Sequence, residues 1–165
     1  MNGVIILLRV LVFSDTHGDL GLAFKIIKKE RADMVLHAGD FLRDAHALAN
    51  EAQFPVHGVT GNCDLPGSGP HEKFLSLEGK DFLLTHGHQF RVKASYQSIF
   101  YKASENKIDA VVFGHSHVPL NDYHQGILLF NPGSISRPQP GSQPSYGIIT
   151  IKDNDINGEI HFVDG

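Results

Sequence analysis

The sequence has a single cysteine, no tryptophan, and no run of apolar residues long enough to cross a bilayer. One cysteine, Cys63, excludes an internal disulfide and is typical of a reducing compartment, so we expect a cytoplasmic protein. A membrane-spanning helix needs about 20 apolar residues, so we expect no membrane partner. Residues 1–8 are apolar like a signal-peptide core, but they lack a basic leading segment and a small-residue cleavage site. We interpret them as the start of the first strand, or as extra residues before it.

The sequence also has no excess of positive charge: it contains 14 Lys and Arg and 18 Asp and Glu residues, for a formal net charge of −4. Stable nucleic-acid binding depends on basic side chains, so we do not expect it here. This balance leaves open a transient attack on a phosphodiester. The residue in excess is histidine, with 11 copies. Imidazole is a common metal ligand, so metal sites are the first chemistry to look for.

The length predicts one domain over residues 1–165, large enough to bury about 70% of its unfolded surface. The hydrophobic content of 41% and the charged content of 19% are typical of a globular protein.

Strand and helix patterns alternate over the first 64 residues. The predicted strands are 10–13, 34–38 and 56–59, and the predicted helices are 20–29 and 44–51. Asp19 is the expected N-cap of the first helix. This β-α-β-α-β order predicts a parallel sheet with right-handed crossovers.

The second half of the chain predicts mostly strands. A hairpin at 72–77 and 80–85, a helix at 94–106 and a strand at 110–113 are followed by strands at 120–123, 127–131, 146–151 and 159–163. We expect Asn157-Gly158 to form a hairpin turn. Two mixed sheets face to face, with helices outside both, would bury all these strands. The predicted fold class is therefore α/β, a four-layer α/β/β/α sandwich.

Polar residues that can bind metals follow five of the predicted strands. They are Asp15, His17, Asp40, Asn62, His86, His115 and His117. Ligand sites of open α/β sheets lie beyond the carboxyl ends of strands, so we expect these side chains to meet at one rim. Each has an ordinary alternative: Asp40 can cap a helix, Asn62 can form a turn, and a loop histidine can be solvated. Their repetition at strand ends favours a metal site.

The order of these motifs resembles that of the calcineurin-like metallophosphoesterases, most of all their small single-domain phosphodiesterase branch. The motifs are Asp15-x-His17, Gly39-Asp40, Gly61-Asn62-Cys63-Asp64, His86-Gly87 and Gly114-His115-Ser116-His117. The resemblance extends over nearly the whole chain and implies the metallophosphoesterase fold.

The resemblance also implies two metal sites that share Asp40. One is held by Asp15, His17, Asp40 and His117, and the other by Asp40, Asn62, His86 and His115. It implies two divalent ions, with Mn²⁺ favoured, and Ni²⁺, Fe²⁺, Co²⁺ and Zn²⁺ also suit this mixture of oxygen and nitrogen ligands. A hydroxide bridging the ions would attack phosphorus in line.

Three residues are the expected catalytic residues: Asn62, Asp64 and His88. Asp64 would orient a neighbouring ligand, and His88 would contact the substrate. Cys63 stands where many relatives have a histidine that is thought to protonate the leaving group, which leaves the identity of the acid open.

The function implied by the resemblance is hydrolysis of a small-molecule phosphodiester. Two alternatives stay open: a phosphomonoesterase of the same fold, and a non-catalytic scaffold like the retromer subunit that shares this fold. That scaffold has lost several site histidines, whereas the ligand set here is complete. A homodimer and a homotetramer both remain open as assembly states.

Overall fold

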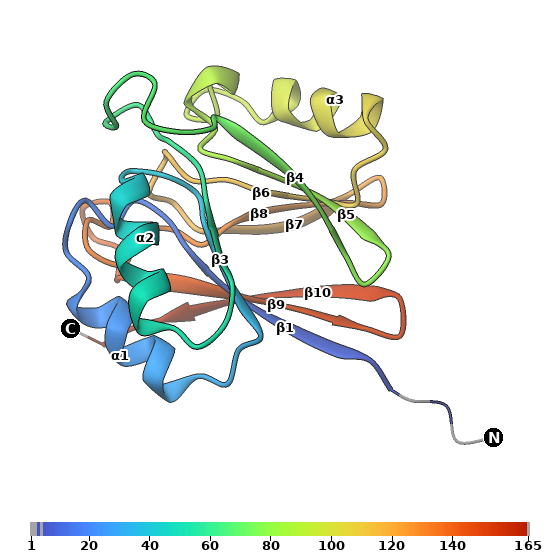
Figure 1. Cartoon of the computed structure of the whole chain (residues 1–165). Coiled ribbons are helices and arrows are strands. Elements are labelled where there is room, and N and C mark those ends of the chain that lie inside the picture. Colours follow the sequence, from blue (N-terminus) through green and yellow to red (C-terminus); the bar gives the residue numbers. More distant parts are fainter. Residues whose placement is uncertain (1–2, 4, 165) are drawn as a thin grey trace.

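The computed structural model describes Gly3 and residues 5–164 (Figure 1). Its helices are α1 (Gly21–Lys29), α2 (Leu42–Glu51), α3 (Gln97–Glu105) and the short 3-10 helix η1 (His88–Phe90). Its strands are β1 (Leu7–Phe13), β2 (Met34–His37), β3 (Val56–Gly58), β4 (Glu72–Leu77), β5 (Lys80–Thr85), β6 (Ala110–Val112), β7 (Leu120–His124), β8 (Ile127–Asn131), β9 (Ser145–Lys152) and β10 (Asp155–Phe162). Across this described part of the chain, no helix combines the length and apolar character needed to cross a membrane.

Both sheets are mixed and have five strands. In the first, the order is β10-β9-β1-β2-β3, with β1 parallel to β2 and antiparallel to β9. In the second, the order is β4-β5-β6-β8-β7, with β6 parallel to both β5 and β8. The parallel β1-β2-β3 core confirms the alternating pattern predicted for the first half of the chain.

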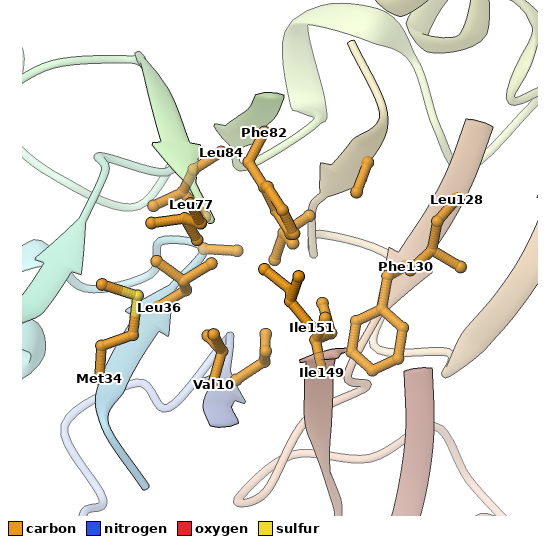
Figure 2. Packing of buried hydrophobic residues seen from close by; sticks show 14 of the residues in the cluster. Val10, Met34, Leu36, Leu77, Phe82, Leu84, Leu128, Phe130, Ile149 and Ile151 are labelled. Carbon is orange, nitrogen blue, oxygen red and sulfur yellow. The ribbon is translucent and has the colours of Figure 1, made fainter. Parts of the chain in front are cut away.

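The two sheets pack face to face, and helices cover their outer faces: α1 and α2 lie against the first sheet and α3 against the second (Figure 1). This arrangement confirms the predicted α/β/β/α sandwich. Figure 2 shows the central layer, where Val10 and Leu36 of the first sheet meet Phe82 and Phe130 of the second.

The alternation of side chains along β1 explains how one strand serves two layers. Val10 and Val12 point into the layer between the sheets, and Leu11 and Phe13 point toward α1 and α2. All four are at most 1% exposed. A strand buried on both faces is apolar throughout, as this one is from Val10 to Phe13.

The predicted turn at Asn157-Gly158 is wrong. The β9–β10 turn is formed by Asp153 and Asn154, whose φ angles of 49° and 69° suit a two-residue hairpin loop. Gly158 lies inside β10, where a Cβ atom would come within 2.5 Å of Asn121 Oδ1. The glycine therefore allows β7 to approach closely. Gly158 is explained by this contact and not by a turn.

The predicted helix starts also need correction. The N-cap of α1 is Leu20, which has no side-chain cap, so the prediction that Asp19 is the N-cap is wrong. Asp19 Oδ1 instead accepts a 3.3 Å hydrogen bond from the Gly21 amide. Helix α3 begins at Gln97 rather than at residue 94, because Ser95 Oγ accepts a hydrogen bond from the Gln97 amide and residues 94–95 close a turn onto Arg91.

Candidate metal centre

Loops after β1, β2, β3, β5 and β6 meet at one end of the sandwich and carry all seven expected ligands. Because β1, β2 and β3 are parallel, their carboxyl ends lie at the same rim, and β5 and β6 deliver their loops in the same way from the second sheet. Backbone bonds join the rim, with the amides of Asp15 and His17 donating to the carbonyls of Gly39 and Asp40.

One half of the site surrounds Asp15, which is fully buried. Its Oδ1 lies 3.2 Å from Nε2 of His117 and 3.9 Å from Nε2 of His17. Its Oδ2 accepts hydrogen bonds from the Ser14 hydroxyl and the His115 amide. Oδ2 is thus held by the protein, while Oδ1 faces three imidazoles, those of His17, His117 and, at 3.7 Å, His86.

The other half surrounds Asp40 and His86. Nε2 of His86 lies 3.2 Å from Asp40 Oδ2, 3.0 Å from Asn62 Oδ1 and 3.7 Å from Asp15 Oδ1. Asp40 Oδ2 is also 3.8 Å from Nε2 of His17. The two halves are therefore continuous, and Asp40 lies between His17 and His86.

The outer nitrogens of two histidines are tied to the backbone. Nδ1 of His86 donates to the Ala38 carbonyl at 2.7 Å, and Nδ1 of His117 donates to the Arg137 carbonyl at 2.5 Å. Metal-binding histidines commonly hold their outer nitrogen in this way, which leaves Nε2 free as a ligand.

The donor atoms of this cluster fit a cation. Asp15 Oδ1 and His17 Nε2 are buried and have no hydrogen-bond partner in the described residues. The side chains form three overlapping groups with all ligand atoms within 4.8 Å: Asp15, His17 and His117; His17, Asp40 and Cys63; and Asp15, Asp40 and His86. Buried acceptors that face one another need a positive charge between them, and divalent cations supply it.

The charges within the cluster shift its pKa values in opposite directions. Burial opposes the ionised form of Asp15 and of Asp40, yet contacts with His117 and His86 outweigh burial and lower the pKa of both carboxyl groups. The hydrogen bond to Asp15 raises the pKa of His117, and for His86 the contact with Asp40 overcomes burial to raise the pKa. The site therefore favours carboxylates beside positive charge.

His115 lies at the edge of this cluster, farther from the other ligand atoms. Its ring centroid is 5.1 Å from that of His86, and it belongs to none of the three groups of close ligand atoms. Burial, followed by the charge of His86, lowers its pKa to about 4, so the ring stays neutral. A neutral ring is the form that binds metals.

The three expected catalytic residues border the cluster in different ways. Asn62 faces His86, as described above. Asp64 accepts hydrogen bonds from the amides of Gly61 and Leu42, which fixes the loop that carries Asn62 against the start of α2. The ring of His88 is 5.4 Å from that of His86, and its Nδ1 is buried without a hydrogen-bond partner in the described part of the chain.

Two sets of supporting contacts were not predicted from the sequence. Ser134 and Ser136 both donate hydrogen bonds to the carbonyl of Asp15, and thereby hold the first loop. Thr16, His37 and Asp44 form a buried hydrogen-bonded chain beside the site. The only signal for either set was the position of these polar residues near the ligand motifs.

Comparison with known proteins agrees with this geometry. The chain is 34% identical over 149 residues to the probable metallophosphoesterase YsnB of Bacillus subtilis, covering 89% of this chain and 86% of that protein. It is 30% identical over 176 residues to the phosphodiesterase YfcE of Escherichia coli K12, covering 91% and 90%. The crystal structure of a predicted phosphoesterase from Streptococcus pneumoniae superposes with a TM-score of 0.81 at 28% identity, covering 95% and 90%.

The family model described as the calcineurin-like phosphoesterase superfamily domain matches residues 8–154, a span that contains every residue of the cluster. This match confirms the resemblance carried by the motifs. The chain belongs to the calcineurin-like phosphoesterase superfamily.

Proposed function

We propose that this protein is a binuclear metal-dependent phosphodiesterase that acts on small-molecule phosphate esters. The observation that carries the proposal is the meeting of two buried carboxylates and three imidazole Nε2 atoms, with Asp15 Oδ1 and His17 Nε2 unpaired within the described residues. The name of the relative YfcE, a phosphodiesterase, favours diesters over monoesters.

Two divalent ions would be held by overlapping sets of residues. Asp15, His17, Asp40 and His117 would hold the first, and Asp40, Asn62, His86 and His115 the second. The position of Asp40 Oδ2 between His17 and His86 supports its role as the shared ligand. Mn²⁺ is the favoured ion, and Ni²⁺, Fe²⁺, Co²⁺ and Zn²⁺ are alternatives.

Ions held there would supply a water-derived nucleophile at neutral pH and would neutralise charge on the phosphoryl oxygens. The chain's own residues prepare this site. The Ala38 and Arg137 carbonyls orient the rings of His86 and His117, and Asp64 holds the Asn62 loop in place. His88, whose Nδ1 has no hydrogen-bond partner among the described residues and whose ring lies beside that of His86, would hydrogen-bond a substrate oxygen.

Other predictions complete this proposal: residues 1–165 form one domain, the protein is cytoplasmic, and it binds neither membranes nor nucleic acid stably. A homodimer and a homotetramer remain alternatives for its assembly.

The test compares hydrolysis of bis(4-nitrophenyl) phosphate and 4-nitrophenyl phosphate by protein whose metal content has been measured. We expect two bound ions per chain, diester turnover that chelation abolishes, and a higher kcat/KM for the diester. Preference for the monoester would make the protein a phosphomonoesterase. Two bound ions without turnover of either ester would support the scaffold instead.

A further inference from the structure

A pocket of about 500 Å³ opens beside the metal cluster at the start of α2. Its walls include Phe41, Leu42, Arg43, His46, Cys63 and Leu65. This volume lies within the range of small-molecule sites. None of the seven proposed metal ligands lines it, although Cys63, which groups with His17 and Asp40, does, so it is a neighbouring feature of the same rim.

Two residues connect this pocket to the cluster. The sulfur of Cys63 lies within 4.8 Å of the ligand atoms of His17 and Asp40. Phe41 follows Asp40 directly, and its ring is 5.5 Å from that of His17, in an edge-on arrangement. An ester whose phosphorus lies at the cluster can therefore extend one of its two organic groups into the pocket.

Arg43 gives the pocket a positive charge that the protein leaves available. Its guanidinium carbon lies 4.4 Å from the centre of the Phe41 ring, and its side chain has no hydrogen bond or ion pair to any described residue. Stacking on an aromatic ring restrains a guanidinium while leaving its N–H donors free.

Two acidic residues lie near Arg43, and Asp64 lines the pocket itself, but neither forms an ion pair with the Arg43 side chain in the described part of the chain. Asp64 accepts from the Leu42 and Gly61 amides through its two oxygens. Asp44 is buried and directs Oδ2 to Thr16 and Gly18. Phe41, Leu42 and Leu65 give the pocket an apolar wall that suits a carbon skeleton, and the other lining residues are His46, Cys63, Asp64 and Ser68.

We infer that this pocket selects phosphodiesters in which one organic group carries a second anion, held by Arg43, with its carbon skeleton against Phe41 and Leu65. The inference rests on the proposed phosphodiesterase function and specifies its substrate class. Carboxylate and phosphate both present oxygens that a guanidinium binds through paired hydrogen bonds, so the shared chemistry is an anionic oxygen group.

The experiment uses symmetric diesters, so that either side can enter the pocket. They are bis(4-carboxyphenyl) phosphate, bis(4-phosphonophenyl) phosphate and, as the neutral match, bis(4-carbamoylphenyl) phosphate. The quantity measured is the ratio of kcat/KM for each anionic ester to that for the neutral ester, in wild type and Arg43→Gln. Comparing ratios cancels the intrinsic reactivity of each ester.

We expect Arg43→Gln to lower this ratio by about tenfold or more, because hydrogen bonds to charged groups are among the strong ones. Arg43→Lys should retain part of the preference. Arg31→Gln removes the same charge before β2, at the opposite end of the strand from Asp40, and should leave the ratio at its wild-type value. The anionic ester whose kcat/KM ratio falls further in Arg43→Gln shows whether a carboxylate or a phosphate-like group fits the pocket better.

A ratio that is the same in wild type and Arg43→Gln, with all esters hydrolysed, would overturn the inference while the phosphodiesterase function stands. Failure of the metal-loaded protein to hydrolyse any diester would overturn both.

Discussion

The hydroxyl of Thr16 donates a 2.5 Å hydrogen bond to Oδ2 of Asp44. Thr16 Oγ1 in turn accepts from Nε2 of His37 at 2.9 Å, because Nδ1 of His37 accepts from the Gly39 amide and the ring proton must lie on Nε2. All three side chains are at most 4% exposed. Asp44 also accepts a hydrogen bond from the Gly18 amide. These bonds therefore tie the loop after β1 to the end of β2 and to α2.

Removing the hydroxyl of Thr16 should weaken metal binding. Thr16 separates Asp15 from His17, and both neighbours have left-handed φ angles, of 55° and 48°, that surrounding contacts must maintain. We expect Thr16→Val, which keeps the side-chain shape, to lower Mn²⁺ affinity by about 10- to 100-fold. Equilibrium dialysis of Mn²⁺ measures the effect.

Thr16→Ser is the matched control, since it keeps the hydroxyl and should bind Mn²⁺ nearly as the wild type does. If Thr16→Val bound Mn²⁺ as tightly as Thr16→Ser, the hydrogen-bonded chain would have no role in positioning the ligands.

Acid should destabilise the protein through His37. Burial lowers the pKa of this histidine from 6.5 to about 4, so its neutral form is favoured in the folded state. Because the folded pKa lies below the unfolded one, the stability is fully present above pH 6.5 and is lost as the pH falls toward 4. The loss amounts to about 3 kcal/mol.

The measurement is the free energy of unfolding by urea between pH 7 and pH 4, with chelator present throughout so that metal release does not contribute. His37→Gln cannot titrate and should show a shallower decline by the same amount. Parallel pH profiles for the two proteins would contradict the prediction.

The sequence predicted that the candidate ligands meet at one rim, because their positions depend on local features. Asp15, Asp40 and His86 each lie within three residues of the end of a strand, and parallel strands bring such positions to one rim. The layered fold could be predicted for the same reason. The alternation of strands and helices and the apolar character of residues such as Val10 and Phe130 can be read from the sequence.

What the sequence could not supply were contacts between side chains distant in the chain. Thr16, His37 and Asp44 carry no common signal, and their relationship arises only when β2 and α2 pack beside the first loop. The turn at Asn157-Gly158 failed similarly, since the need for glycine came from Asn121 on another sheet.

A change at Asp40 should affect both of the proposed metal ions. Its Oδ2 faces His17 on one side and His86 on the other, while Oδ1 accepts from the Cys63 amide. Asp40→Asn can retain the amide contact but loses the negative charge, so we expect both ions to bind more weakly and activity to disappear. His17→Ala should weaken mainly one ion. The number of metal ions bound per chain after gel filtration distinguishes the two variants. If Asp40→Asn retained two ions and full turnover, Asp40 would not be a ligand shared by both ions.

Chelation should lower stability together with activity. Folding brings the candidate ligands together from five loops, so metal ions would bind the native state in preference to the unfolded chain. At a free metal concentration 100 times the dissociation constant, this linkage contributes about 2.7 kcal/mol. Thermal unfolding with Mn²⁺ and with chelator measures it, and Asp40→Asn, the control, should show a smaller difference. An unchanged Tm after verified metal removal would argue against a site assembled by folding.

The proton donor for the leaving group can be tested at Cys63. Its backbone amide donates to Asp40, and its sulfur lies within 4.8 Å of the ligand atoms of His17 and Asp40. Without metal, burial, followed by the charge of Asp40, raises the pKa of this thiol above its ordinary value of 9.0. Two cations bound beside it would act in the opposite direction and favour the thiolate, which cannot donate a proton.

We therefore expect the wild type to hydrolyse nitrophenyl diesters well and to slow steeply as the leaving group becomes more basic. Cys63→His supplies an acid with an ordinary pKa near 6.5 and should recover part of the ~10²–10⁴-fold contribution of a well-placed acid on alkyl esters. Nitrophenyl turnover should change little, because that leaving group departs without protonation. Cys63→Ser, which cannot supply such an acid, should retain the steep dependence. The measurement is the slope of log kcat/KM against leaving-group pKa for the three proteins. Equal, shallow slopes would mean that another group, such as His88, already donates the proton.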